Sequence, residues 1–267
     1  MGVLNLTPDS FADGGRWMDP DAAADAALAM EAAGADIIDV GGESTRPGAE
    51  PLAVDEELAR VIPVLDRLAP RLRVPISLDT YKAPVADAGV ARGVAIVNDI
   101  SALRYDPALS AVVARTGAAV VLMHNRGHSR AMYQEARYAS VAEDVRDDLG
   151  ERLLAAVEAG IPRERILLDP GIGFAKRAEH SLAMLARLPV LASLGRPLLV
   201  GPSRKSFLTA ALGERHVDAR EWGTAAAVAF AVIGGAHIVR VHAVPEMTDV
   251  IRTVDALLQA AASDTSP

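Results

Sequence analysis

The chain has 267 residues, which is long enough for one domain with a sizeable core. Hydrophobic residues make up 51% of it and aromatic residues only 4%. This composition suits buried parallel strands better than a β-sandwich rich in aromatic residues. The net charge of −8 argues against a nucleic-acid or anionic-membrane partner, because both require a basic surface. Without cysteine, the chain forms no disulfide, thiol nucleophile or zinc–thiolate site. It has no recognisable secretory signal and no apolar span of about 20 residues, so we expect a cytoplasmic protein.

Short apolar runs alternate with stretches of helical periodicity along the whole chain, and this alternation predicts an α/β protein. Residues 54–69 place their apolar side chains on one helical face, with Pro63 expected to bend the helix, and residues 244–260 repeat the pattern. Eight apolar runs are candidate strands: 2–6, 36–40, 75–79, 94–98, 118–123, 165–169, 197–201 and 236–241.

Strands that alternate with helices form parallel sheets with right-handed crossovers, and eight strands can close into a (β/α)8 barrel, the TIM barrel. We therefore expect a single barrel domain over residues 1–260, followed by a small, polar and disordered tail over residues 261–267. An open doubly wound sheet is the alternative. It is weakened because NLTPDSF, rather than a Gly-x-Gly-x-x-Gly turn, follows the first strand.

Polar residues end seven of the apolar runs or follow them closely. In a parallel barrel the loops after the carboxyl ends of the strands meet at one mouth, and these loops carry the chemistry. The side chains are therefore expected to share one site: Asn5, Glu43, Asp79, Asn98, Asp169, Lys205 and His242.

The first two loops offer oxygen ligands and a cation. NLTPDSF (residues 5–11) contains amide, hydroxyl and carboxylate oxygens, which suit magnesium beside a phosphate, although a simple Pro-Asp turn explains the same letters. GGESTRPG (residues 41–48) carries Arg46, which could clamp an anion or remain solvated.

The third, fourth and sixth strands end in residues suited to a flat heterocycle. Asp79 and Asn98 together could bind its donor–acceptor edge, but each alone could equally cap a helix. In LDPGIGF (residues 168–174), two glycines allow close approach of a ligand to the backbone, and Phe174 can present its ring.

The seventh and eighth strands lead to positive charge. GPSRKSF (residues 201–207) provides backbone donors and Lys205, which fit a phosphate or a ring carbonyl. Strand alternation puts Arg240 and His242 on one face. This pair matches the phosphate corner of TIM barrels, whereas an isolated His would indicate a core residue.

In this order, the motifs NLTPDSF, GGESTRPG, ISLDT, VNDIS, LDPGIGF, GPSRKSF and RVH resemble those of dihydropteroate synthases. The resemblance implies that the amine of p-aminobenzoate attacks the exocyclic methylene of 6-hydroxymethyl-7,8-dihydropterin diphosphate, without a covalent enzyme intermediate. Pyrophosphate is released and 7,8-dihydropteroate forms for folate synthesis. The resemblance further implies Mg²⁺, inhibition by sulfonamides, and a homodimer formed through helices near the C-terminus.

The resemblance also implies roles for individual residues. The pterin contacts are Asp79, Asn98, Met123, Asp169 and Lys205, and the diphosphate contacts are Asn5, Thr45, Arg240 and His242. The p-aminobenzoate contacts are Thr45, Arg46, Pro47, Phe174 and Ser206. Asn5 is the implied magnesium ligand, and Lys205, Arg240 and His242 are the implied catalytic residues.

Three alternatives stay open. A catalytically silent pterin-binding paralogue is suggested by Ala243, where the family usually has Asp after Arg-Val-His. A corrinoid-dependent methyltetrahydrofolate methyltransferase shares the pterin-binding barrel. It binds no diphosphate, so GPSRKSF and the pair Arg240 and His242 count against it. The third alternative is an unrelated barrel with a phosphate site; in that case Asp79, Asn98 and Asp169 would serve only as helix caps. Glu43 fits a brace of its loop as well as a substrate contact.

Overall fold

A computed structural model describes residues 1–7, 19–44, 50–127, 133 and 136–264, and strands alternate with helices along it. Each strand overlaps one of the eight predicted runs, so this prediction is confirmed. The strands are β1 (Gly2–Asn5), β2 (Ile38–Gly41), β3 (Ile76–Asp79), β4 (Val94–Asp99), β5 (Ala119–Met123), β6 (Ile166–Asp169), β7 (Leu199–Val200) and β8 (Ile238–Val239).

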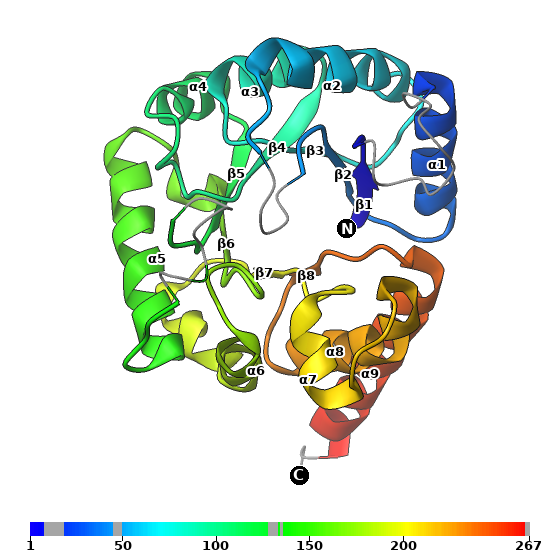
Figure 1. Ribbon diagram of the computed structural model, residues 1–267, viewed down its shortest axis with the longest axis vertical. Coiled ribbons are helices and arrows are strands. Elements are labelled where there is room, and N and C mark those ends of the chain that lie inside the picture. Colours follow the sequence, from blue (N-terminus) through cyan, green and yellow to red (C-terminus); the bar gives the residue numbers. More distant parts are fainter. Residues whose placement is uncertain (8–18, 45–49, 128–132, 134–135, 265–267) are drawn as a thin grey trace.

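The strands close into a barrel. β1 to β6 pair in sequence order as parallel neighbours, and β7 pairs with β8. Two parallel bridges complete the ring, one between Leu168 and Leu198 and one between Gly2 and Val241. The Val3 amide donates to the Val241 carbonyl at 3.1 Å. Figure 1 shows the helices around the outside of this ring, so the architecture is the expected TIM barrel.

Helices cover the outer face of the barrel. α2 runs unbroken through Pro63. The long helices are α1 (Pro20–Ala32), α2 (Val54–Leu68), α5 (Val141–Glu158), α8 (Glu221–Ile233) and α9 (Val244–Asp264). The shorter ones are α3 (Ala83–Val90), α4 (Leu109–Thr116), α6 (Ala178–Ala186) and α7 (Thr209–Leu212), with 3₁₀ turns η2 (Arg163–Arg165), η3 (Leu188–Leu194), η4 (Ser206–Leu208) and η5 (Val217–Arg220).

The C-terminal boundary differs from the prediction. α9 continues to Asp264, so residues 261–264, expected to belong to a disordered tail, are helical. The reason is local, because the preceding alanines have the highest helix propensity of any residue and extend the helix without packing. Residues 265–267 lie outside the described residues.

Apolar side chains fill both sides of the strands. Met1, Ile96, Val121 and Leu199 form a small buried cluster, while two larger clusters join strands to the surrounding helices. Burial on both sides explains why the strands read as continuous apolar runs. None of the described helices combines the length and apolarity needed to cross a membrane.

Candidate active site

Strand register brings three of the predicted polar residues to one level of the barrel mouth. Asn5 of β1 pairs with Gly41 of β2, Gly41 pairs with Asp79 of β3, and Asp79 pairs with Asn98 of β4. A Cβ placed on Gly41 would stand 3.7 Å from both Asn5 Oδ1 and Asp79 Oδ2. The glycine therefore leaves a gap between an amide oxygen and a carboxylate.

Arg240 ties this group together. Its Nε donates to Asp39 Oδ2 at 2.6 Å, and its Nη2 donates to Asp79 Oδ2 at 3.0 Å. Asn98 Nδ2 also donates to Asp39 Oδ2, at 3.1 Å. Arg240, expected as an anion anchor beside His242, is thus already paired with two carboxylates from neighbouring strands.

Asp39 was not among the predicted site residues. It lies within β2 and is fully buried, and its Oδ1 has no hydrogen-bond partner among the described residues. A carboxylate inside an apolar strand requires a cation, because an unpaired buried charge is very costly. That requirement was the signal available in the sequence, and Arg240 at the end of β8 meets it.

Burial and charge act against each other in this group. Burial raises the pKa of Asp79 to about 7, and the positive charge of Arg240 opposes the rise. Burial disfavours the charge of Arg240, but Asp39 and Asp79 outweigh it and raise the pKa of the guanidinium. Arg240 is therefore cationic at every physiological pH, whereas Asp79 can exchange a proton near neutrality.

A second group forms at the loops after β6 and β7. Asp169 Oδ1 accepts from the Gly171 amide at 2.7 Å. Lys205 Nζ donates to the Ile172 carbonyl at 2.5 Å and lies 4.6 Å from the centroid of the Phe174 ring. Three predicted residues, Asp169, Lys205 and Phe174, thus lie on one side of the mouth.

Electrostatics links Asp169 and Lys205 to the first group. Burial lowers the pKa of Lys205 to about 8, and the charge of Asp169 opposes this effect. Burial raises the pKa of Asp169, which Lys205 opposes. A Cβ placed on Gly201 would stand 3.7 Å from Lys205 Nζ and 3.8 Å from Arg240 Cβ. The two cations are therefore neighbours across the end of β7.

His242 is oriented by a serine of the loop after β7. The Ser203 hydroxyl accepts from the His242 amide at 3.3 Å and lies 2.9 Å from Nδ1 of the ring. Since the hydroxyl accepts from the backbone, its own proton can be donated to Nδ1. Ser203 thus supplies an orienting contact for His242, and the residue that follows His242 is Ala243, which has no polar side chain. Sequence reasoning did not single out Ser203.

The remaining predicted residues are less closely connected. Ser206 begins η4 and is exposed, and within the described part of the chain it makes no hydrogen bond to another predicted site residue. Glu43 braces its loop: it accepts from the Leu52 amide at 3.1 Å and from the Tyr81 hydroxyl at 2.9 Å, and it pairs with Lys82. Thr45, Arg46 and Pro47 lie outside the described residues.

The described side chains at the mouth do not form a closed cage of protein ligands for a metal ion. Among the described residues, no three His, Asp or Glu side chains gather as a metal-binding group. Mg²⁺ is commonly held by one or two protein oxygens together with substrate phosphates and water. Asn5 Oδ1, at the gap beside Gly41, fits this mode.

Known dihydropteroate synthases resemble this chain in both sequence and fold. The pterin binding enzyme model matches residues 1–242. Dihydropteroate synthase of Synechocystis sp. is 45% identical over 96% of this chain and 89% of that protein. Dihydropteroate synthase of Yersinia pestis, solved with a sulfonamide drug, has a TM-score of 0.92 at 40% identity, covering 97% of this chain and 93% of that chain. That of Xanthomonas albilineans, solved with 7,8-dihydropteroate, has a TM-score of 0.87 at 38% identity, covering 100% and 93%. The chain belongs to the pterin binding enzyme family.

Proposed function

We infer that this chain forms 7,8-dihydropteroate from p-aminobenzoate and 6-hydroxymethyl-7,8-dihydropterin diphosphate, the reaction of its dihydropteroate synthase relatives. One observation carries the inference. Asp79, Asn98 and Asp169 line one barrel mouth together with two cations, Arg240 and Lys205. Groups that bind the N–H edge of a flat ring therefore stand beside the charges that a diphosphate requires.

The pterin side consists of strand-end residues. Asp79 and Asp169 accept ring N–H groups, and Asn98 both donates and accepts. Lys205 lies against the ring, where its ammonium can bind a ring carbonyl. Met123 forms part of the wall, since it is 4% exposed and pairs in register with Asp169.

The diphosphate side consists of Asn5, Arg240 and His242, joined by Thr45 from the second loop. Arg240 would exchange part of its contact with Asp39 and Asp79 for phosphate oxygens. Mg²⁺ would be held by Asn5 and the diphosphate, and when bound it would neutralise charge on the leaving group.

The reaction needs positioning and charge stabilisation more than a protein nucleophile. The amine nitrogen of p-aminobenzoate forms a bond to the methylene carbon, the bond from that carbon to the diphosphate oxygen breaks, and the amine loses a proton. Phe174 and Ser206, with Thr45, Arg46 and Pro47, would bind p-aminobenzoate. Arg240 and His242 would stabilise the departing pyrophosphate.

The assembly is proposed to be a homodimer formed through helices near the C-terminus. α8 and α9 pack side by side (Figure 1) and expose large apolar side chains to solvent. Trp222 is 88% exposed, Ile233 60% and Leu257 66%. Exposed apolar patches mark interaction surfaces, and these three side chains stand on two adjacent helices. Trp222→Glu is expected to yield a monomer in sedimentation velocity, where the unmodified chain is expected to sediment as a dimer.

The absence of cysteine is compatible with a cytoplasmic location.

A coupled assay of pyrophosphate release tests the reaction directly. Pterin diphosphate and Mg²⁺ are supplied with and without p-aminobenzoate, and release is expected only when the amine is present. Pterin binding without amine-dependent release would favour the silent paralogue. Ala243 is the argument for that alternative, and the Ser203 contact to His242 weakens it. Methyl transfer from methyltetrahydrofolate to a corrinoid is the matching test for the methyltransferase alternative.

A further inference from the structure

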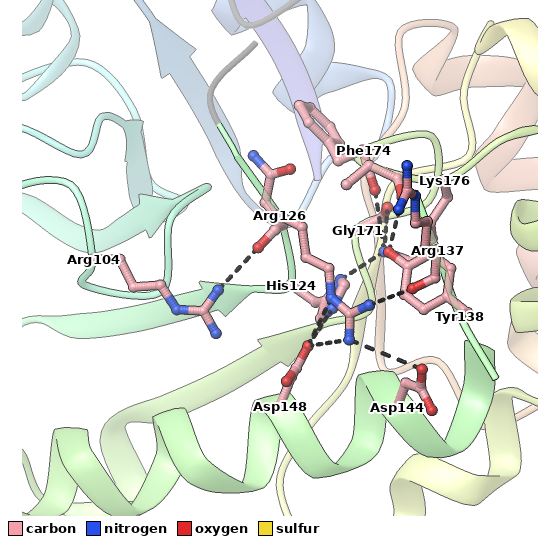
Figure 2. Close-up of polar contacts among 12 residues, drawn as sticks. Arg104, His124, Arg126, Arg137, Tyr138, Asp144, Asp148, Gly171, Phe174 and Lys176 are labelled. Atoms are coloured by element: carbon pink, nitrogen blue, oxygen red, sulfur yellow. Dashed lines mark hydrogen bonds and ion pairs between the residues drawn. The ribbon is translucent and has the colours of Figure 1, made fainter. Parts of the chain in front are cut away.

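Lys176 is buried beneath the loop that follows β6. It is 1% exposed, and its ammonium has three acceptors: His124 Nδ1 at 2.7 Å, the Gly171 carbonyl at 3.2 Å and the Phe174 carbonyl at 3.2 Å. Figure 2 shows these contacts converging on one nitrogen. Burial lowers the pKa of Lys176 well below its ordinary value, and the charge of Asp169 opposes this effect. Three hydrogen-bond partners nevertheless surround its nitrogen, and two of them are carbonyls of the same loop.

His124, at the end of β5, links Lys176 to a helix. Its Nε2 lies 3.0 Å from Asp148 Oδ2 on α5. Burial and the neighbouring Lys176 lower the pKa of His124 to about 3, so the ring is neutral and carries one proton. That proton belongs on Nε2, which faces the carboxylate, and Nδ1 is left to accept from Lys176. The hydrogen bond from His124 and those from Arg126 hold the pKa of Asp148 well below its ordinary value.

Arg126 and Tyr138 extend the same network to the far end of the loop. Arg126 Nη2 donates to Asp148 at 2.9 Å, and its guanidinium carbon lies 4.4 Å from the centroid of the Tyr138 ring. The Tyr138 hydroxyl donates to the Ala175 carbonyl at 2.8 Å. Ala175 has a φ of 47°, a left-handed conformation that a non-glycine residue adopts only when its surroundings impose it.

The loop held in this way carries two groups of the reaction site. Between the Gly171 and Phe174 carbonyls lies Ile172, whose own carbonyl accepts from Lys205, and the Phe174 ring faces the same ammonium. Gly171 rests directly on the end of β5, since a Cβ there would stand 2.0 Å from the His124 carbonyl oxygen. The loop backbone therefore accepts hydrogen bonds from two lysines: the buried Lys176 bonds the Gly171 and Phe174 carbonyls, and Lys205 of the site bonds the Ile172 carbonyl.

Lysine is also a rare choice in this chain. Of 27 basic residues only three are lysines, namely Lys82, Lys176 and Lys205. A guanidinium could not replace the Lys176 ammonium in the same geometry, because its donors lie in one plane whereas the three acceptors surround a point. The fully buried position thus suits the compact amino group of a lysine.

We propose that Lys176 is a positioning residue for dihydropteroate synthesis, which holds residues 170–175 so that the Phe174 ring lies on the p-aminobenzoate side and the Ile172 carbonyl meets Lys205 beside the pterin. The proposal rests on the proposed function. Lys176 itself contacts no substrate, and it acts through the loop. Its loss should therefore affect p-aminobenzoate more than the pterin, most of whose contacts stand on strands.

Steady-state kinetics of Lys176→Met test the proposal. The KM for p-aminobenzoate is expected to rise at least about tenfold, while the KM for pterin diphosphate changes by less than about threefold. Lys176→Gln, which keeps two of the donors, should fall between Lys176→Met and the unmodified chain. Tyr138→Phe, which removes only the hydroxyl bond to Ala175, should raise the same KM by a smaller factor and serves if Lys176→Met fails to fold.

Leu188→Ala is the matched control for general destabilisation, because Leu188 is an apolar side chain fully buried in the core and is not part of the hydrogen-bond network around Lys176. It should lower Tm without changing either KM. If Lys176→Met and Tyr138→Phe lower Tm but leave the KM for p-aminobenzoate unchanged, Lys176 is merely structural and the proposal fails. If the unmodified chain shows no amine-dependent pyrophosphate release, the proposed function fails, and the role of Lys176 fails with it.

Discussion

The two sides of the barrel mouth are built in different ways. On one side, Asp39, Asp79, Asn98 and Arg240 stand on strands and contact one another directly. On the other side, Lys205 and Phe174 are placed by loop carbonyls, which a buried network then holds from beneath. The first side derives its order from the sheet register, and the second derives it from side chains remote from the substrates.

This difference matters for how each side fails. A strand position is fixed by the ladder hydrogen bonds of its neighbours, so a substitution there changes charge while leaving the backbone in place. A loop position depends on a few hydrogen bonds, and losing one of them moves several groups together. We therefore expect strand-side variants to act through the charge that they change, and loop-side variants to act by moving the groups that the loop carries.

The largest effect is expected at Arg240. Arg240→Met leaves Asp39 and Asp79 buried without a cation, so we expect a loss of about 3 kcal/mol in the free energy of unfolding and at least about a hundredfold in kcat/KM, roughly 2.7 kcal/mol. Urea denaturation and steady-state kinetics measure the two losses.

A double variant separates the two losses. Asp39→Asn added to Arg240→Met should restore stability, because one buried charge is removed, while leaving activity low. If stability is not restored, the ion pair is not the source of the destabilisation. If Arg240→Met retains activity, the diphosphate role assigned to Arg240 is wrong.

On the loop side, Lys205→Ala and Asp169→Asn are each expected to lower kcat/KM at least about tenfold, roughly 1.4 kcal/mol. Both groups are partners in one electrostatic pair, so the losses in the double variant should be less than additive. Kinetics of the two single variants and the double variant give the coupling. Values close to those of the unmodified chain for both singles would contradict the site assignment.

Gly41→Ala probes the gap on the strand side. The added Cβ makes only ordinary contacts, the nearest at 3.4 Å from Asp79 Cβ, so Tm should change little. It would nevertheless stand between Asn5 and Asp79, and we expect about a threefold to tenfold rise in the Mg²⁺ concentration needed for half-maximal rate. Gly150→Ala in α5 is the control, because its φ is not positive either and the nearest atom to the added Cβ is Leu194 Cδ2, also at 3.4 Å. An unchanged magnesium requirement would remove Asn5 from the metal site.

The pH dependence of Lys205 separates activity from stability. Its pKa is lowered from 10.5 to about 8, so the ammonium is lost as pH rises through about 8, and kcat/KM should fall on that alkaline limb. Between the two pKa values the unfolded chain binds more protons, so the contribution of Lys205 to the free energy of unfolding rises with pH. Lys205→Arg should move the limb to higher pH, and an unmoved limb would assign it to another group.

The smallest expected effect concerns inhibitor competition. Sulfonamides should compete with p-aminobenzoate, on the loop side, and leave the KM for pterin diphosphate unchanged. Inhibition kinetics with each substrate varied in turn measure both patterns. If sulfonamides competed with pterin diphosphate instead, the assignment of the two substrates to the two sides of the mouth would be wrong.

The fold could be predicted almost completely from the sequence, because buried parallel strands leave continuous apolar runs and the polar residues that end them must share a mouth. β7 and β8 are shorter than the runs 197–201 and 236–241, since only two residues of each enter the ladder. The C-terminal helix was predicted too short for a local reason, its alanine-rich end.

The site was predictable where side chains follow strand register and not where distant contacts decide. Asp79, Asn98 and Asp169 come from the register. Asp39 was missed because its place in the site depends on its ion pair with Arg240, which is 201 residues away in the chain. Lys176 was missed because nothing in the letters FAKR indicates that its nitrogen lies under the preceding loop. The substrate contacts assigned to the site residues stay predictions, and Thr45, Arg46 and Pro47 also lie outside the described residues.

The pairing of Arg240 with Asp39 and Asp79 has a consequence for folding kinetics. The two ion pairs join residues 201 and 161 positions apart, and the bridge between Gly2 and Val241 spans nearly the whole chain. Such contacts form late, because the entropy of closing long loops must be overcome first. During refolding, recovery of pterin binding is therefore expected to lag behind recovery of the helical circular dichroism signal.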